Sequence, residues 1–320
     1  MSESPGTRYV RIAGPEPHSA RAREILRRHP EVRQLIRPNP GSFWWIVGLV
    51  IAHLTIAALV SEAPWWIVVV VAYVIGAFLT HALGVLIHES AHHLVFRRPV
   101  PSILAGMLAN LPLFFPSARL FQIYHLRHHA FLGVYELDGD IPSLWEARLA
   151  GRSPVGKALW LSLFPLIQLV RLVRMKEIRA IDGWVVANTA IQIGFNVAVV
   201  LVLGPKALAY LVLSLYFPLS LHLLGGRWVQ EHFLASVSGQ ETFSYYGPVN
   251  RLTFNVGHHV EHHDFTGVAW NNLPKLRRLA DDSYNALESH ASMTKLLGQF
   301  LFGPDRSLFQ RVVRERGAGG

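Results

Sequence analysis

Long apolar runs alternate with polar, arginine-containing segments along this chain. Four of the runs are close to the roughly 20 residues that a helix needs to cross a bilayer. They cover residues 43–60, 65–87, 184–203 and 207–224. Only residues 61–64 separate the first two runs, and only a Gly-Pro turn separates the last two. The pattern therefore predicts an all-α integral membrane protein with four transmembrane helices arranged in two hairpins.

Three further segments are apolar or amphipathic but poorly suited to crossing a membrane. Residues 100–118 are short and interrupted by prolines, which predicts a re-entrant or interfacial segment. Residues 158–173 contain Pro165 and Arg171, so we expect an interfacial helix there. Residues 20–36 combine arginines with apolar positions, which predicts a basic helix along the membrane surface, interrupted at Pro30.

The distribution of positive charge predicts the topology. The net charge is +9, and Lys and Arg concentrate in the polar segments, whereas the two hairpin turns contain only Lys206. Positive segments stay on the cytoplasmic side of a membrane, so both hairpins enter from that side and return to it. We divide the chain into a basic cytoplasmic or interfacial segment (1–42), a membrane domain (43–285) and a cytoplasmic tail (286–320). From the absence of Cys and the abundance of Arg and Ala, we expect a bacterial inner membrane.

Histidines are clustered in the polar segments that share one predicted side. Spacings of three or four residues place imidazoles on one face of a helix. The clusters are His88, His92 and His93; His125, His128 and His129; and His259, His262 and His263. Imidazole is a ligand for Zn, Cu, Fe and Ni, and this many nitrogens exceed the needs of one ion. We expect a cytoplasmic helical cap that holds a histidine-rich dimetal site.

Two other classes of protein contain histidines of this kind. His88, Glu89 and His92 fit the zinc-protease pattern, and Leu137-Asp138-Gly139 resembles the third-ligand motif of intramembrane metalloproteases. A zinc protease uses three protein ligands and would leave two of the clusters unexplained. A metal transporter would place its ligands within the spans. Only His53, His81 and His222 lie there.

The motifs are similar to those of a known superfamily. The three boxes, His88-Glu-Ser-Ala-His92-His93, His125-Leu-Arg-His128-His129 and His259-Val-Glu-His262-His263, resemble those of the membrane fatty acid desaturases and hydroxylases. The stretches 18–26, 138–142 and 241–257 resemble one branch, the sphingolipid (dihydroceramide) 4-desaturases. This resemblance extends over residues 16–285.

The resemblance implies a set of metal ligands and residues around them. Two Fe ions would be held by the box histidines and by His232, which follows Glu231. His93 and His258 depart from the usual family pattern, so their roles are open, as are those of His81 and His222. We expect His18, His29, His53 and His290 to be structural or exposed at the surface. Metal-bound imidazoles usually donate their second N–H to a carboxylate or carbonyl. Candidates for supporting the ligands or orienting the substrate are Glu89, Asp138, Asp140, Glu231, Tyr245, Tyr246, Asn255, Glu261 and Asp264.

The resemblance also implies the reaction. Molecular oxygen would be the co-substrate for removing two hydrogens from adjacent carbons in the long-chain base of a dihydroceramide-type lipid. An acyl-lipid or acyl-CoA desaturase, or a C4-hydroxylase of the same superfamily, is the alternative. No flavin fingerprint is present, so we expect an external electron-donor protein, and a basic face would suit an acidic one. We expect no nucleic-acid partner, and the oligomeric state is open.

Overall fold

The computed structural model describes residues 8–175, 177–178, 180–234 and 240–315. Most of them are helical. The α-helices are α1 (His18–Arg28), α2 (Ser42–Val60), α3 (Trp65–Val71), α4 (Ala77–Ala91), α5 (Pro99–Asn110), α6 (Ala118–Ala130), α7 (Leu144–Ala150), α8 (Pro154–Arg174), α9 (Gly183–Leu203), α10 (Pro205–Leu219), α11 (Arg227–Gln230), α12 (His259–Asp264), α13 (Leu273–Leu279), α14 (Asp281–Tyr284) and α15 (Met293–Phe302). Short 3-10 or π segments are η1 (Pro30–Leu35), η2 (Ala72–Gly76), η3 (Leu111–Leu113), η4 (Leu223–Gly226) and η5 (Pro248–Arg251). The strands are β1 (Val10–Arg11), β2 (Ser244–Tyr245), β3 (Ser289–His290) and β4 (Val312–Val313).

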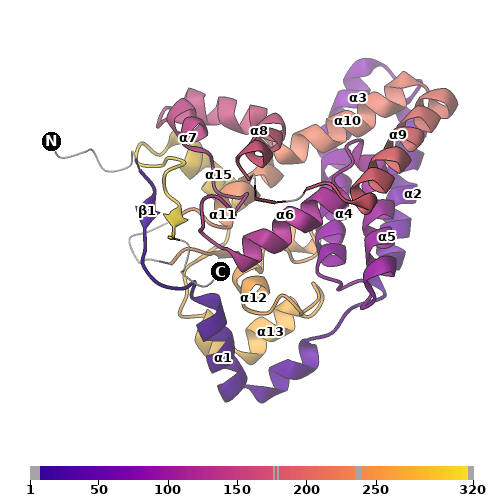
Figure 1. The fold of residues 1–320 in the computed structure, drawn as a ribbon. Helices are drawn as coiled ribbons and strands as arrows, with labels where there is room; N and C mark the ends of the chain where they lie inside the picture. The colour runs from indigo at the N-terminus through magenta and orange to yellow at the C-terminus, as the bar shows by residue number, and fades with distance from the viewer. Residues whose placement is uncertain (1–7, 176, 179, 235–239, 316–320) are drawn as a thin grey trace.

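The two predicted hairpins form one helical bundle. Helices α2, α3, α9 and α10 share an apolar core that includes Ala57, Val68 and Tyr210, and α4 and α5 lie beside them on the right of Figure 1. The Lys206 ammonium donates a hydrogen bond to the Ala63 carbonyl at 3.1 Å. The two hairpin turns therefore lie side by side at one end of the bundle.

The number of spans is less sharply defined than the sequence pattern predicted. Five helical stretches of the described residues are long and apolar enough to cross a membrane, or six if α5–η3 and α6 form one bent span. Four of the five correspond to the predicted spans. The additional one is Pro154–Leu172, within α8, where an interfacial helix is predicted. Length and composition alone therefore do not single out the predicted four.

The stretch Trp65–Ala91 is longer than a bilayer core requires. Its 27 residues would extend about 40 Å at 1.5 Å per residue, against a hydrocarbon thickness of about 30 Å. Its last turn, which contains His88, can therefore project beyond the membrane.

A sharp bend follows α5. The α5–η3 and α6 segments meet at 116°, an angle found in broken spans and re-entrant loops. The Asn110 side chain stabilises the bend, because its oxygen accepts the Ser117 and Ala118 N–H groups at 2.8 Å and its amide donates to the Phe115 carbonyl. This geometry brings α6 back toward the end of α4.

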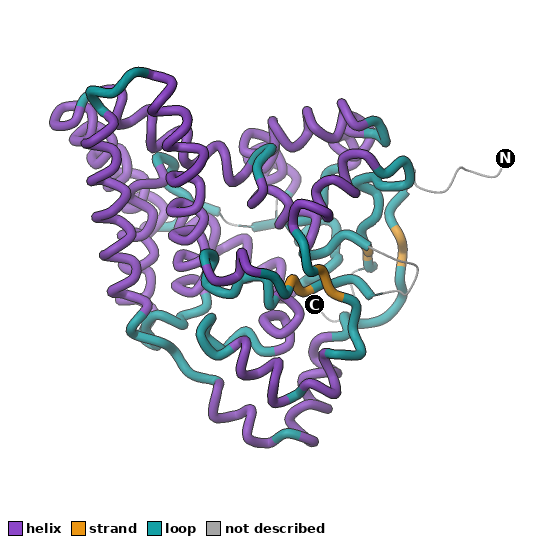
Figure 2. The backbone as a smooth tube through the Cα atoms, turned by 180° about the vertical axis from the view of Figure 1, so that it is seen from behind, coloured by secondary structure: helices purple, strands orange, loops and turns teal. Residues whose placement is uncertain are grey.

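The N-terminal segment packs into the cap region, which we define as α1, η1, α12, α13 and α14. Ile25 and Val32 are fully buried there, against a core that includes Val260 and Leu276. Helix α1 packs against α12 and lies at the lower end of the molecule, where short helices gather in both views (Figures 1 and 2). The predicted interruption at Pro30 coincides with the start of η1. Strand β1 pairs in parallel with β4 near the other end of the chain.

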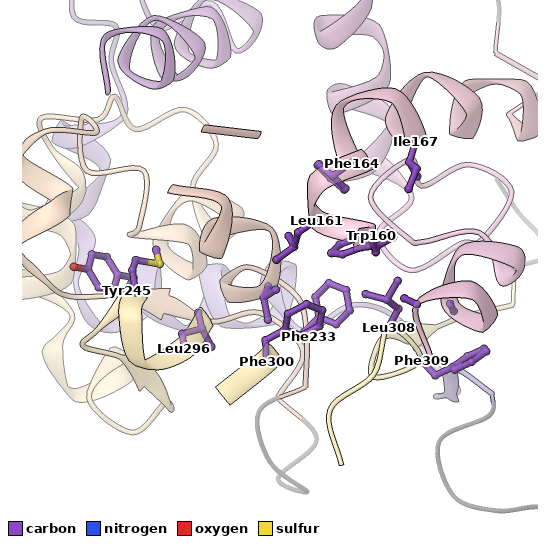
Figure 3. Close-up of a cluster of buried hydrophobic side chains, with 14 residues drawn as sticks. Trp160, Leu161, Phe164, Ile167, Phe233, Tyr245, Leu296, Phe300, Leu308 and Phe309 are labelled. Carbon is purple, nitrogen blue, oxygen red and sulfur yellow. The ribbon is translucent and has the colours of Figure 1, made fainter. Parts of the chain in front are cut away.

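A third core joins α8 to the C-terminal region. Trp160, Leu161 and Phe164 of α8 face Phe300 and Leu308 in Figure 3. This packing fixes one face of α8, while Leu166 and other residues of the opposite face stay exposed. Helix α8 thus connects an apolar outer surface with the region around α11.

Candidate metal centre

Nine buried or nearly buried histidines from four parts of the chain converge between the bundle and the cap region. His88 and His92 lie at the end of α4, and His232 follows α11. The others lie on α6 (His125, His128 and His129) and on α12 (His259, His262 and His263). The structure therefore gathers all the predicted ligands except His93.

Five of these histidines form one group. The ligand atoms of His88, His92, His125, His129 and His262 all lie within 4.8 Å of one another. Within this five-histidine group, the Nε2 atoms of His92 and His125 are 2.9 Å apart, and those of His125 and His129 are 3.0 Å apart.

The other four histidines form a second group. His128, His232 and His263 offer ligand atoms within 4.8 Å of one another. His259 joins them, because its Nε2 is 2.9 Å from that of His232 and 3.1 Å from that of His263. We call this set the four-histidine group.

Adjacent histidines contribute to different groups. Neighbouring residues on a helix point about 100° apart, so His128 and His129 diverge, as do His262 and His263. The groups nevertheless adjoin, with the rings of His129 and His263 4.3 Å apart. The repeated His-His pairs thus supply ligands to two neighbouring positions.

The state of the imidazoles fits metal binding. Burial, and then the neighbouring imidazoles, lower the pKa of His125, His129 and His262 well below the usual value, so these side chains are neutral. Neutral imidazole is the form that coordinates transition metals. The buried His128 Nε2 has no hydrogen-bond partner among the described residues. A cation bound between the converging nitrogens would give such atoms a partner.

Asp138 supports His128 in the predicted manner. The His128 Nδ1–H donates to the Asp138 carboxylate at 2.8 Å, which leaves Nε2 as the ligand atom. Burial alone would lower the pKa of His128, but the carboxylates of Asp138 and Asp140 raise it to about 9. Backbone N–H groups of Gly133 and Asp140 also donate to Asp138 at 2.9 Å and hold it in place.

Helix α8 fixes the loop that carries Asp138. The Arg174 guanidinium donates to the carbonyls of Asp138 and Ile141 at 2.8 and 3.0 Å. Arg171 forms a buried ion pair with Glu146 at 2.7 Å. The Nη1 of Arg171 lies 3.4 and 3.5 Å from the carbonyl oxygens of Gly139 and Asp140 in this loop.

The remaining carboxylates differ in their relation to the histidines. Glu231 lies 3.7 Å from the Nδ1 of His259 and is paired with Arg227. Glu89 instead accepts the Trp270 backbone N–H at 3.1 Å, and among the described residues it forms no hydrogen bond or ion pair with a histidine side chain.

Glu261 and the tyrosines form a separate network. Glu261 accepts hydrogen bonds from Ser244 at 2.6 Å, Tyr246 at 2.7 Å and His258 at 3.2 Å. The Tyr245 hydroxyl accepts the Val249 N–H. Both tyrosine hydroxyls are therefore engaged within the protein, and the predicted role in orienting substrate stays a prediction.

The other histidines lie outside both groups. His93 adopts a positive φ of 57° directly after the end of α4. His53 donates to or accepts from Thr80, and His222 contacts Tyr73 in the bundle. His81 is buried there too. Asn255, also in a positive-φ conformation, donates to the Trp270 carbonyl at 3.2 Å.

Two residues near the site were not among the predicted supporting residues. His18, expected to be structural or exposed, is buried with its ring 4.9 Å from that of His263. Thr242 lies between His18 and His232. The sequence signal for both was their position inside branch-specific stretches rather than inside a histidine box.

A small, partly open pocket lies against the four-histidine group. Residues of α8 and α11 provide aromatic walls, and polar groups lie among them. The lining consists of Asp140, Trp160, Phe164, Gln168, Arg171, Trp228, Glu231, His232, Phe233 and Arg311. The Trp228 Nε1–H is buried without an acceptor among the residues that the structure describes.

Comparison with known proteins is consistent with this geometry. The fatty acid desaturase family model matches residues 64–295, and the sphingolipid Δ4-desaturase model matches residues 9–41. The chain is 36% identical over 306 residues to the Drosophila melanogaster sphingolipid delta(4)-desaturase DES1, covering 94% of each chain. It is 37% identical over 300 residues to an Arabidopsis thaliana DES1-like desaturase, covering 94% of this chain and 90% of the relative.

A third relative carries a double name. The human sphingolipid delta(4)-desaturase/C4-monooxygenase DES2 is 36% identical over 304 residues, covering 93% of this chain and 92% of the relative. These relatives are eukaryotic, so the prediction of a bacterial inner membrane receives no support. The chain is a multi-pass membrane protein that belongs to the fatty acid desaturase superfamily and, within it, to the sphingolipid Δ4-desaturase family.

Proposed function

We propose that this protein is an oxygen-dependent sphingolipid Δ4-desaturase, which introduces a double bond into the long-chain base of dihydroceramide-type lipids. The observation that carries the proposal is the full-length similarity to desaturases of this branch, including the N-terminal segment. The convergence of nine histidines in two adjoining groups supports the same chemistry.

In this proposal, one iron is held by each histidine group. The two irons, when bound, supply the activation of oxygen that cleavage of an unactivated C–H bond requires. The protein's own part is to hold the imidazoles in one orientation. Asp138 does so for His128 by accepting its Nδ1–H.

The pocket beside His232 is the proposed site for the polar end of the lipid. Its aromatic walls from α8 adjoin the exposed apolar face of the same helix, so an acyl chain in the bilayer and a head group in the pocket would be continuous. Asp140 can accept hydrogen bonds from the hydroxyl and amide groups of a ceramide head, and Gln168 can both accept and donate them. An acyl-CoA substrate would require a large basic nucleotide surface instead.

C4-hydroxylation is the second candidate function. It is favoured by the similarity to relatives such as human DES2, whose name gives both a delta(4)-desaturase and a C4-monooxygenase. Desaturation and hydroxylation begin at the same C–H bond and differ in whether a second hydrogen is lost or a hydroxyl is gained. One residue difference in the pocket could therefore shift the product.

Lipid mass spectrometry after expression in cells supplied with dihydroceramide tests the proposal. A product lighter by two hydrogens, with the double bond in the long-chain base, is expected. A product heavier by one oxygen would favour the hydroxylase. If only fatty acyl chains gained double bonds, the sphingolipid assignment would be wrong.

We propose further that the site faces the cytoplasm, where an acidic electron-donor protein can approach the basic surface. Lys and Arg lie mainly outside the hairpin turns. Reporter fusions after Glu62 and Pro205 should lie outside, and fusions after Ile181 and Gly320 inside. A fusion at Arg152 that reported outside would contradict this topology.

A further inference from the structure

His18 lies deep in the protein although it begins the basic helix α1. Only 3% of its surface is exposed. Its Nδ1 is 2.7 Å from an oxygen of Asp264, and its Nε2 is 2.9 Å from the Thr242 hydroxyl. These partners are more than 200 residues away in sequence, and Asp264 directly follows His263 of the four-histidine group. Helix α1 is thus joined to the metal centre through the ring of His18.

Two groups contact the His18 Nδ1. The Asp264 carboxylate, 2.7 Å away, only accepts, whereas the Arg21 Nη2, 2.9 Å away, only donates and also donates to the same carboxylate oxygen at 2.8 Å. We assign the hydrogen to the His18 Nδ1, because its contact with Asp264 is the shorter of the two and the Arg21 Nη2 already has an acceptor in Asp264. In this tautomer the His18 Nε2 accepts the hydrogen of the Thr242 hydroxyl. Arg21 neutralises the buried Asp264 through bonds of 2.7 and 2.8 Å.

The chain of hydrogen bonds continues to a proposed metal ligand. The Thr242 Oγ1 lies 3.4 Å from the Nδ1 of His232. The Thr242 hydrogen is directed at His18, so a lone pair of the oxygen can accept the His232 Nδ1–H. That tautomer leaves the His232 Nε2 as the ligand atom within the four-histidine group.

We propose that His18 and Thr242 are positioning residues for His232, and that they link it to the charge of Asp264. The proposal rests on the proposed function, because it assigns His232 to iron. It gives the N-terminal segment a role in the metal centre: α1 completes the hydrogen-bond shell of one metal position. The competing explanation is that these contacts only tether α1 to the rest of the cap region.

Variants at Thr242 separate the two explanations. Thr242→Val keeps the shape and removes the hydroxyl, and Thr242→Ser restores it. His18→Phe keeps a ring and removes both nitrogens. Asp282→Asn is the matched control, because Asp282 binds α1 and its C-cap through Arg28 and His29 (2.9 Å) at the surface, away from the hydrogen-bond chain.

The measurement is iron retained per chain by the purified full-length protein after equilibration with increasing chelator. Loss of such a supporting partner typically weakens metal binding by about 10- to 100-fold. We expect Thr242→Val and His18→Phe to release one iron at correspondingly lower chelator concentration. Thr242→Ser and Asp282→Asn should retain both irons as the wild type does.

Two results would overturn the inference while leaving the proposed function intact. One is a Thr242→Val protein that keeps both irons as tightly as the wild type. The other is an Asp282→Asn protein that loses iron as readily as Thr242→Val, which would show that docking of α1 is what matters. A wild-type protein that holds no iron would instead overturn the proposed function, and the inference with it.

Discussion

The two histidine groups lie side by side but differ in what supports their rings. In the four-histidine group, His128 donates to Asp138 and His259 lies near Glu231, while His232 is connected through Thr242 and His18 to Asp264. In the five-histidine group, no ion pair between a histidine and a carboxylate occurs among the described residues. The Nδ1 atoms of His88 and His262 are buried there without a partner in the same part of the chain.

This difference has a chemical meaning. A carboxylate behind an imidazole fixes its tautomer and raises its basicity as a ligand. The four-histidine group therefore has fewer imidazoles, but carboxylates polarise some of them. In the five-histidine group, metal binding relies on the number of imidazoles instead. We expect the two proposed iron positions to respond differently to substitution.

The largest effect should follow removal of a histidine itself. His262→Ala opens the five-histidine group beside His129, whose Nε2 is 3.1 Å away. Activity should fall below detection, and elemental analysis should show about one iron per chain fewer than the wild type. His290→Ala, outside both groups, is the control and should keep both. If activity survived His262→Ala, the assignment of the α12 histidine box to the metal site would be wrong.

Removal of a supporting carboxylate should have the next largest effect. Asp138→Asn keeps the volume but removes the charge that accepts the His128 Nδ1–H, so iron binding should weaken by about 10- to 100-fold. Glu89→Gln is the matched substitution at a buried carboxylate beside the five-histidine group, and it should have a much smaller effect on iron retention. If the two substitutions weakened iron retention equally, the proposed difference in carboxylate support between the two groups would be wrong.

Weakening the contacts that hold the loop carrying Asp138 should lower iron affinity at the four-histidine group, but by less than Asp138→Asn does. Arg174→Gln removes the guanidinium that holds the Asp138 and Ile141 carbonyls. Because Asp138 keeps its bonds to Gly133 and Asp140, we expect a smaller loss, about tenfold or less in iron affinity. Chelator titration measures it, with Arg148→Gln on the exposed side of α7 as the control. A larger loss than that of Asp138→Asn would mean that Arg174 holds more than this loop.

Much of this arrangement was readable from the sequence. The apolar runs predicted the two hairpins, and the histidine spacing predicted the convergence of the boxes. The division into two groups also has a sequence signal. Consecutive pairs such as His262 and His263 cannot face the same point from one helix.

The features that escaped prediction depend on contacts distant in sequence or on local backbone shape. His18 lies in an arginine-rich helix, and nothing nearby indicates that Thr242 and Asp264 surround it. His93 belongs to a box by spacing, but the helix ends before it and its positive φ places it outside both groups. The hydrogen bond from the Tyr246 hydroxyl to the buried Glu261 is another contact that the sequence does not indicate.

The smallest predicted effect concerns the side from which substrate approaches. The pocket contacts His232 and Glu231, so the lipid head would lie nearer the four-histidine group than the five-histidine group. The Trp228 N–H in the pocket wall has no acceptor among the described residues, and a ceramide hydroxyl or amide oxygen could accept it. One hydrogen bond contributes about 0.5–1.5 kcal/mol. Trp228→Phe should therefore raise KM for dihydroceramide by about twofold to tenfold, with kcat and iron content unchanged.

The control for this substitution is Trp66→Phe, since Trp66 is exposed at the opposite end of the bundle. Steady-state kinetics in detergent micelles of fixed composition would separate KM from kcat. A fall in kcat and iron content at constant KM would show that Trp228 supports the four-histidine group rather than the substrate. An unchanged KM, kcat and iron content would place the lipid head elsewhere, and the proximity of the pocket to His232 would then have no bearing on substrate binding.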